Sequence, residues 1–369
     1  MIHMRYSMKK TRKKKKKMRL KISKFTILIA LLDILCIGLL LLIYTNDKFT
    51  NYFITTAMTT KSHKYLAYTL YSKETIDKVI ESNYIETTTE KIKLDDIIIG
   101  SDNMFTKKYN NQYEKELFTK DPGNDVYKTI RIIEPRYKGW LVGIYDPSDV
   151  KLSVSSRLGR MGDTINKMVK DHNALVGING GGFEDLDGWG NGSIPYGAII
   201  ENGKLIWTHA GGSGELIGFT KEHKLWLTND DPHTAISKGM VEAVEFGPNL
   251  IVNGKAMTVH GDGGWGVAPR TVIAQRKDGV VLFLIIEGRL PGYSIGASMN
   301  DVISILKRYK AYNAANLDGG ASSTMSVEGK LWNRPSAGGE YGGRTLSNGW
   351  IVTNTKNKKA QAPQKENYK

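Results

Sequence analysis

The most apolar stretch of the chain runs from Phe25 to Tyr44 and is interrupted by one charged residue, Asp33. Twenty helical residues rise about 30 Å, which is the thickness of the hydrocarbon core of a bilayer. A cleaved signal peptide usually has a shorter apolar region that ends in small residues, whereas this stretch ends in Leu39–Tyr44. We therefore expect residues 25–44 to be an uncleaved transmembrane anchor.

Residues 45–125 are polar and rich in Thr, Lys and Tyr. The clearest element in them begins at Ser72, a residue suited to an N-cap, and places Ile76, Val79 and Ile80 on one helical face. This segment carries no recognisable chemistry. We expect it to form a membrane-proximal stalk with short helices.

From residue 126 onward, short apolar runs alternate with turn residues, which is typical of β-strands. The predicted strands are Trp140–Tyr145, Ala174–Ile178, Gly197–Ile200, Leu225–Thr228, Thr271–Gln275 and Val280–Ile286. Asn202-Gly203 and Asp278-Gly279 separate such runs and favour the positive φ angles of hairpin turns. Much of the sheet is therefore expected to be antiparallel.

Two helices are predicted among these strands. One begins near Asp163 and carries apolar residues at helical spacing. The other begins at Ser298 and continues to Tyr309, because Ser298 and Asp301 have the spacing of a capping box. The predicted fold class is α+β, with a mixed, largely antiparallel β-sheet core, a few flanking helices and one preceding transmembrane helix.

These patterns divide the chain into five parts. We expect a basic cytoplasmic tail (1–24), the anchor (25–44), the stalk region (45–125), one large domain (126–355) and a disordered polar tail (356–369).

The formal net charge of +15 would suggest a nucleic-acid partner if it were spread over the chain. Residues 1–24, however, carry twelve Lys or Arg and no acidic residue, so the remainder has a charge of +15 − 12 = +3. A basic cluster beside an apolar span holds that end in the cytoplasm. We therefore expect a single-pass membrane protein with its large domain outside the cell, and no nucleic-acid partner. Cys36 is the sole cysteine and lies in the apolar stretch, so the outer domain has no disulfide.

Two familiar catalytic motifs are absent from the sequence. It has no P-loop and no His-Glu-x-x-His, which removes support for P-loop nucleotide-binding and zinc-protease functions. Four polar clusters, most of them punctuated by glycine, lie beside predicted strands instead: 179–183, 269–271, 287–289 and 316–324. Strand ends are where a rigid scaffold presents reactive side chains. A single cluster would most often be a tight turn, but four together favour a functional site.

The clusters contain groups that suit a phosphate and a sugar. Asp318 and Glu287 supply the two carboxylates that glycoside chemistry normally needs. Glycine backbone N–H groups, hydroxyls and planar guanidinium groups suit phosphate oxygens. The candidates of these kinds are Gly180, Gly319, Gly320, Ser322, Ser323, Thr324, Arg270, Arg289 and Arg344.

Metal chemistry has little support in the sequence. Isolated histidines such as His209 and His233 do not have the spacing of metal ligands, so we expect no zinc and no required cofactor. A calcium or magnesium ion held by carboxylates and carbonyls is left open. Trp265, in the glycine-rich loop before Arg270, is a candidate for stacking on a sugar face, with a plain surface loop as the alternative.

The same segments resemble the phosphodiester glycosidase family. The resemblance rests on the order and spacing of Ile178–Phe183, Ala268–Thr271, Glu287–Gly296, Asn316–Met325 and Arg344–Asn348, and it covers roughly residues 126–354. The family usually has Asp where Glu287 stands, which keeps a carboxylate but changes its reach. The anchor and stalk resemble those of bacterial exported members linked to exopolysaccharide or cell-wall metabolism.

The resemblance implies hydrolysis of a sugar-1-phosphodiester, with an N-acetylglucosamine-type sugar. Its leaving group is already the anion of a strong acid, so charge stabilisation should dominate over protonation. The expectation is that Arg270, with Arg289 and the loop 319–323, holds the phosphate, while Asp318 or Glu287 attacks the anomeric carbon or activates water. The two carboxylate roles stay open, as does the stereochemical outcome.

The resemblance also gives Asn179 hydrogen bonds to sugar hydroxyls or an acetamido group, with capping of its own turn as the alternative. Two other functions remain open. One is a non-catalytic module that binds phosphate-linked glycopolymers, and the other is a transferase that moves the glycosyl unit to another polymer.

Overall fold

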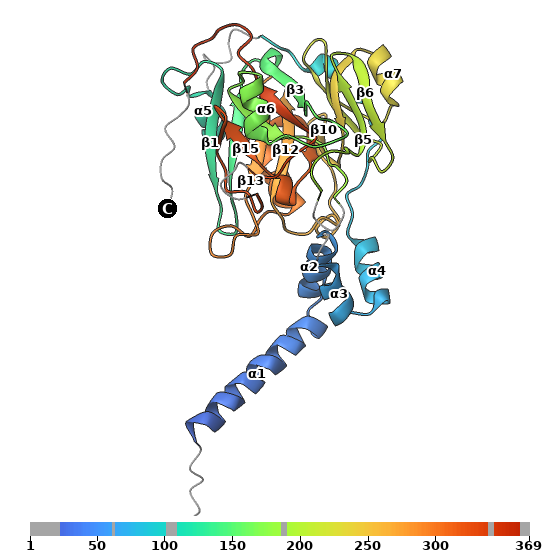
Figure 1. Cartoon of the computed structure of the whole chain (residues 1–369). Helices are drawn as coiled ribbons and strands as arrows, with labels where there is room; N and C mark the ends of the chain where they lie inside the picture. Colours follow the sequence, from blue (N-terminus) through green and yellow to red (C-terminus); the bar gives the residue numbers. More distant parts are fainter. Residues whose placement is uncertain (1–22, 61–62, 101–108, 186–189, 339–342, 362–369) are drawn as a thin grey trace, which may run out of the picture. The chain divides into compact units, whose positions relative to one another are not determined.

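The structure is a computed structural model of the whole chain, and it describes residues 23–60, 63–100, 109–185, 190–338 and 343–361 (Figure 1). The chain divides into two compact units, Met1–Thr50 and Asn51–Lys369. The predicted basic tail lies almost entirely outside the described residues, as does the end of the polar tail from residue 362.

The first unit contains the predicted apolar helix. Helix α1 runs from Lys24 to Thr45, and the hydroxyl oxygen of Ser23 caps it by accepting the N–H of Thr26 at 3.1 Å. It is long and apolar enough to cross a membrane, and only 6% of its most apolar window is buried. An apolar surface of this extent is compatible with membrane anchoring.

The second unit is built on three antiparallel sheets among the described residues. The largest has the strand order β1-β2-β13-β12-β14-β10-β11, and every neighbouring pair is antiparallel. In that order the strands are Tyr127–Ile133, Lys138–Ile144, Val281–Ile286, Arg270–Arg276, Ala311–Leu317, Asn249–Val252 and Lys255–Ala256. The α+β class and the antiparallel sheet predicted from the sequence are confirmed.

Two five-stranded sheets complete the β-structure. One has the order β16-β15-β4-β17-β3, with strands Lys330–Leu331, Met325–Val327, Val176–Asn179, Asn348–Val352 and Val150–Val154. The other has the order β6-β5-β9-β7-β8, with strands Lys204–His209, Gly197–Glu201, Met240–Glu245, Leu216–Thr220 and Leu225–Thr228. Both predicted hairpins are present, since Asn202-Gly203 joins β5 to β6 and Asp278-Gly279 joins β12 to β13.

The helices begin where the capping residues indicate. Ser72 caps α4 and Ser298 caps α8 in a complete capping box with Asp301. The helix expected near Asp163 begins after the cap Thr164, whose hydroxyl oxygen accepts the N–H of Lys167 at 3.3 Å. The α-helices after α1 are α2 (Asp47–Met58), α3 (Lys64–Leu70), α4 (Lys73–Ser82), α5 (Gln112–Phe118), α6 (Ile165–Asp171), α7 (Pro232–Ser237) and α8 (Met299–Arg308).

The large sheet is covered on both faces, which explains its apolar strands. Along β13, Phe283 and Ile285 pack into a core shared with Trp350 of the second sheet. The alternate residues Leu282 and Leu284 face a second core that includes residues of α8. Because successive strand residues point to opposite faces, a strand buried on both sides needs a continuous apolar run.

The segment predicted as a stalk packs onto the sheets. Residues from Asn51 onward belong to the same compact unit as the β-structure. Ile54 and Thr55 are fully buried, and Glu114 of α5 forms a buried ion pair with Arg276 at 3.1 Å. Part of the predicted disordered tail is ordered as well, since the Lys358 ammonium contacts Asp149 at 2.9 Å.

Glu242 of β9 gives the fold a pH-dependent stability. It is only 5% exposed, and burial raises its pKa from 4.5 to about 7. The unfolded chain loses this proton near pH 4.5, whereas the folded chain keeps it until about pH 7. The stability that neutral Glu242 contributes is therefore complete below pH 4.5 and is lost as the pH rises through 7.

We expect Glu242→Gln to raise the free energy of unfolding at pH 8 by up to about 3 kcal/mol and to change it little at pH 4. Urea denaturation at both pH values measures the difference. Glu81→Gln, at an exposed helical position, serves as the control and should change neither value. A gain at pH 4 as large as that at pH 8 would show that packing, and not charge, is responsible.

Candidate active site

The sheet register brings three predicted residues to one edge. In the antiparallel pairs, Arg270 at the start of β12 lies opposite Ile286, and Thr271 lies opposite Leu317. Glu287 and Asp318 directly follow Ile286 and Leu317. The ends of β13 and β14 therefore meet the beginning of β12, although these residues are far apart in the sequence.

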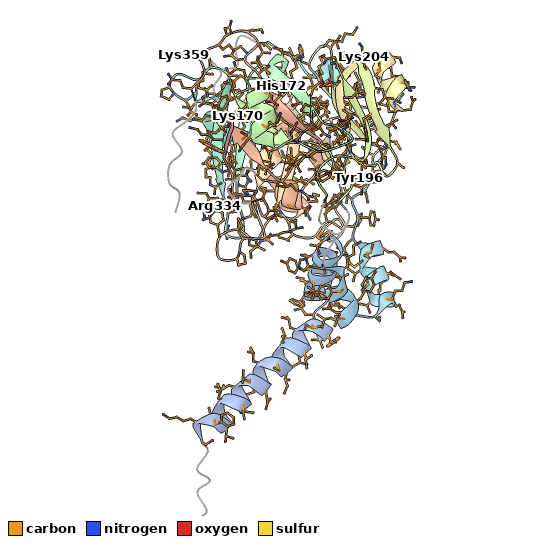
Figure 2. All side chains as sticks on the ribbon, viewed as in Figure 1. Lys170, His172, Tyr196, Lys204, Arg334 and Lys359 are labelled. Atoms are coloured by element: carbon orange, nitrogen blue, oxygen red, sulfur yellow. The ribbon has the colours of Figure 1, made fainter. Side chains whose placement is uncertain are left out.

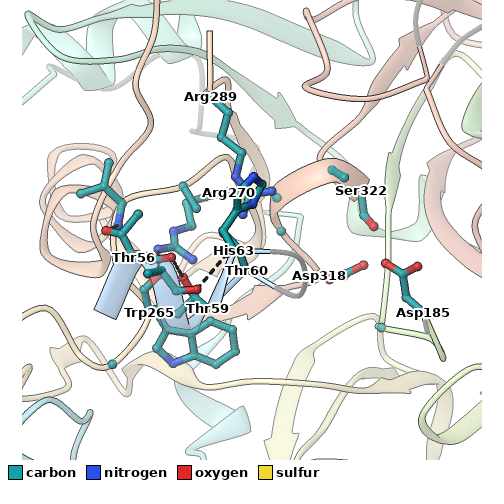
Figure 3. Close-up of a pocket in the computed structure, with 18 of the residues that line it drawn as sticks. Thr56, Thr59, Thr60, His63, Asp185, Trp265, Arg270, Arg289, Asp318 and Ser322 are labelled. Atoms are coloured by element: carbon teal, nitrogen blue, oxygen red, sulfur yellow. Dashed lines mark hydrogen bonds between the residues drawn. The ribbon is translucent and has the colours of Figure 1, made fainter. Parts of the chain in front are cut away.

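A cavity of about 900 Å³ opens at this edge, and Figure 3 shows polar side chains that line it. The predicted site residues that line it are Arg270, Arg289, Asp318, Gly319, Gly320, Ser322 and Arg344. Tyr196, which Figure 2 labels, lines it too. Burial raises the pKa of Tyr196, and the carboxylates of Glu184, Asp185 and Asp318 add to this, so negative charge is concentrated on this side of the cavity.

Asp318 is held in place through its backbone. The Nδ2 of Asn179 donates to the Asp318 carbonyl at 2.6 Å, and the Asp318 N–H donates to the carbonyl of Gly180 at 3.1 Å. The Asn179 Oδ1 accepts from the Thr271 hydroxyl at 2.7 Å and from the Thr324 N–H at 3.2 Å. Asn179 is 1% exposed and does not line the cavity, so it positions Asp318, contrary to the expected contact with a sugar.

Two arginines place positive charge in the cavity. Arg270 is 3% exposed, and burial lowers its pKa to about 10, with a further lowering by the nearby Arg289 cation. Its Nε donates to the Ala297 carbonyl at 3.0 Å, and its Nη2 donates to the carbonyls of Trp265 and Gly266 at 2.7 and 2.6 Å. These bonds fix the guanidinium without neutralising it, because carbonyl oxygens carry no formal charge.

Arg289 has a different environment. Its backbone adopts the left-handed region at φ 58°, which is uncommon for a residue with a side chain and occurs at functional sites. Its guanidinium has no hydrogen-bond partner among the described residues, and the Asp318 carboxylate partly offsets the desolvation that lowers its pKa. A cation that faces a cavity beside a second cation favours binding of an anion.

The Gly319–Ser322 turn approaches Arg289 closely. Gly320 has φ 60°, and a Cβ added there would lie 3.2 Å from the Arg289 Nη1. The Gly320 N–H donates to the Pro269 carbonyl at 2.9 Å, which ties the turn to the start of β12. Ser322 is buried and lines the cavity, whereas Ser323 and Thr324, which we also predicted, are buried in the bonds that support the turn.

A second carboxylate in the cavity comes from Asp185, which sequence reasoning missed. Figure 3 shows the Asp185 and Asp318 carboxylates directed toward each other. Arg344 donates to the Asp185 Oδ2 at 2.8 Å and lies over the Phe183 ring at 4.7 Å. The sequence feature that could have identified Asp185 is its position, two residues after the glycine cluster 179–183.

Glu287 lies at the same edge, but its side chain does not line the cavity, which differs from its predicted role. It is 2% exposed and does not line the cavity. Its Oε2 accepts from Arg131 at 3.1 Å and from the Tyr293 hydroxyl at 2.9 Å, and its Oε1 accepts from the Arg334 N–H at 2.7 Å. Both oxygens of the Glu287 carboxylate accept hydrogen bonds from the protein, which is typical of a structural role. The second carboxylate that lines the cavity is that of Asp185.

The described residues contain no group of three or more His, Cys, Asp or Glu side chains that could hold a metal ion. Trp265 lines the cavity, as the stacking hypothesis requires. The other polar residues of its loop are engaged in packing, since His260 bonds the Glu86 carboxylate at 2.7 Å and stacks on Tyr84. The site therefore offers carboxylates, guanidinium groups and a hydroxyl for chemistry.

Comparison with known proteins points to one family. The family model described as Phosphodiester glycosidase matches residues 172–353. The SPbeta prophage-derived uncharacterized protein YomE of Bacillus subtilis (strain 168) is 30% identical over 203 residues, which is 52% of this chain and 30% of that protein. The chain thus matches less than a third of that relative's length.

A solved structure has a similar fold. The catalytic domain of zebrafish N-acetylglucosamine-1-phosphodiester alpha-N-acetylglucosaminidase, described as auto-inhibited by its pro-peptide, gives a TM-score of 0.51 with 20% identity. The match covers 63% of this chain and 85% of that one. At this identity, the likeness shows a shared fold.

Proposed function

We propose that the chain hydrolyses the glycosidic bond of a sugar-1-phosphodiester, because its residues 172–353 match the family model described as Phosphodiester glycosidase. The observation that carries this proposal is the charge arrangement of the cavity. Arg270 and Arg289 place two cations on one side, and Asp318 and Asp185 place two carboxylates on the other. This matches a substrate with an anionic leaving group and a reacting carbon that becomes cationic in the transition state.

In the proposed reaction, Arg289 and the Gly320 turn bind the phosphate, and buried Arg270 adds positive charge behind them. Asp318 attacks the anomeric carbon or activates the water that does so. Asp185, oriented by Arg344, serves as the second carboxylate. The phosphate leaves with little need of protonation, so stabilisation of its charge contributes most to the rate.

The sugar and the setting are also proposals. The family resemblance favours an N-acetylglucosamine-type sugar, and Trp265 and Tyr196 supply aromatic surface beside the carboxylates for its ring. With α1 as a signal anchor and the basic tail in the cytoplasm, the domain would act at the outer surface of the membrane. Cell-wall or exopolysaccharide metabolism would supply such substrates.

The proposal is tested by release of sugar from synthetic N-acetylglucosamine-1-phosphate esters by the detergent-solubilised full chain. We expect turnover by the parent and a loss of about tenfold in kcat/KM in Gly320→Ala, because the added methyl crowds the Arg289 guanidinium and shifts it by a fraction of an ångström. Gly203→Ala is a matched control, since Gly203 also has a positive φ (72°) but open space around it.

Both variants should lose on the order of 1 kcal/mol of unfolding free energy, because alanine is strained at a positive φ. Gly203→Ala should keep the turnover of the parent. Equal turnover in the two variants would indicate that Arg289 does not bind the phosphate. No release by the parent from a panel of sugar-1-phosphodiesters, with ligand binding retained, would favour the non-catalytic binding module.

A further inference from the structure

The membrane-proximal helices form one wall of the active-site cavity. Tyr52, Phe53, Thr56 and Ala57 of α2 line it, and their spacing places them on one face of the helix. Leu66 of α3 extends this wall. The cavity therefore has a boundary that the glycosidase domain, residues 172–353, does not supply.

This wall is a packed part of the unit. The Thr55 hydroxyl donates to the Asp262 carboxylate, and Ile54 beside it is fully buried. Gly266 lies so close that an added Cβ would be 2.7 Å from the Thr56 Cα, so this approach requires glycine. Helix α2 is thus fixed on the loop that precedes Arg270.

Apolar as well as charged side chains line the cavity. Its apolar lining residues include Tyr52, Phe53, Ala57, Leu66, Trp265 and Ile295, and Thr56, Thr59, Thr60 and His63 of the same helical segment line it beside them. Tyr52 is 40% exposed and Ile295 is 51% exposed, which leaves large apolar side chains open at the cavity. A cluster of exposed apolar side chains marks a binding surface for an apolar ligand.

The cavity also has more room than a sugar phosphate needs. Its volume of about 900 Å³ lies near the upper end for pockets that enclose a drug-sized ligand. In the reaction proposed above, the sugar would occupy the side with Asp318 and Asp185, and the phosphate would occupy the side with Arg289. The remaining space would then be open to the second substituent of the phosphate.

The chain length ties this wall to the anchor. Helix α1 ends at Thr45, and Tyr52 follows seven residues later. Seven residues of fully extended chain span at most about 25 Å. When α1 spans a membrane, the wall therefore remains within reach of the lipid surface.

We propose, on the basis of the function proposed above, that the second substituent is an apolar chain, so the substrate is a lipid-borne sugar-1-phosphodiester drawn from the membrane. Water cleaves the bond between the anomeric carbon and the phosphate oxygen. The sugar gains the hydroxyl group, and the lipid phosphate monoester leaves with the remaining proton. A polar glycopolymer would instead have to place its hydroxyl groups against Phe53, Leu66 and Ile295, which costs free energy.

The test uses the full chain in lipid nanodiscs with N-acetylglucosamine-1-phosphate esters of methanol, butanol, hexanol and glycerol. We expect kcat/KM to rise by about 10²-fold or more from methyl to hexyl, since each buried methylene contributes roughly a fourfold gain. Tyr52→Ser and Leu66→Ser should reduce this gain at least tenfold. Tyr68→Ser is the matched control, because Tyr68 is 55% exposed and does not line the cavity.

The outcomes separate the two proposals. Equal turnover of the methyl and hexyl esters, or a preference for the glycerol ester, would overturn the lipid substrate and leave the glycosidase function standing. A gain with chain length that survives in both wall variants would also overturn it, because partition into the bilayer would then explain the gain. No turnover of any ester would overturn the glycosidase function itself.

Discussion

Asp318→Asn is expected to lower kcat for a sugar-1-phosphodiester by about 10³-fold or more while the fold stays intact. Asn has the shape of Asp but cannot act as a nucleophile or a general base. The bonds that position residue 318 use its backbone N–H and C=O, so the substitution leaves them in place. Steady-state release of sugar, together with a thermal unfolding curve, measures both effects.

The control for this experiment is Asp230→Asn. Asp230 forms an exposed ion pair with Lys238 at 2.8 Å, and such pairs contribute little to stability. This variant should keep the kcat of the parent. If Asp318→Asn retained turnover within about tenfold of the parent, Asp318 would not be the reacting carboxylate, and Asp185 would take its place.

Glu287→Gln is expected to affect stability and to leave the chemistry in place. Glu287 and Arg131 form an ion pair at 3.1 Å, with side chains 1% and 7% exposed. Loss of one partner leaves the other charge buried and uncompensated, at a cost of about 3–5 kcal/mol. Urea denaturation followed by tryptophan fluorescence should show this loss. The folded fraction should keep kcat within about tenfold of the parent.

A double variant tests whether the uncompensated buried charge of Arg131 causes this loss of stability. Arg131→Met combined with Glu287→Gln removes both charges, and the pair should be more stable than the sum of the single changes predicts. A Glu287→Gln protein of normal stability with a 10³-fold lower kcat would contradict the structural role of Glu287. Asp318 and Glu287 would then be the reacting carboxylates, as expected from the sequence.

Local signals determined much of the fold. Strand runs such as Val280–Ile286, the hairpin at Asp278-Gly279 and the capping box at Ser298 depend on residues close together in the chain, and all three are confirmed. Helix α1 is similar, because a predominantly apolar run of this length specifies a membrane-length helix without reference to the rest of the protein. Glycine clusters beside strands also indicated where Asp318 and Arg289 would lie.

The roles of polar residues within those clusters depended on contacts that local sequence does not contain. Asn179 and Glu287 occur in the same kind of cluster as Asp318, yet both are buried among donors and acceptors from distant strands. Asp185 became a site residue because Arg344, more than 150 residues later, holds it in the cavity. Burial and partner geometry follow from sheet register, which is a long-range property.

The sequence by itself therefore determined the elements, the membrane-length helix and the position of the charged edge, since each follows from local pattern and strand-end chemistry. Only the tertiary structure decided which carboxylates face the cavity and that α2 lines it. Helical spacing sets which side chains of α2 share a face, but only packing on the loop before Arg270 brings that face to the cavity.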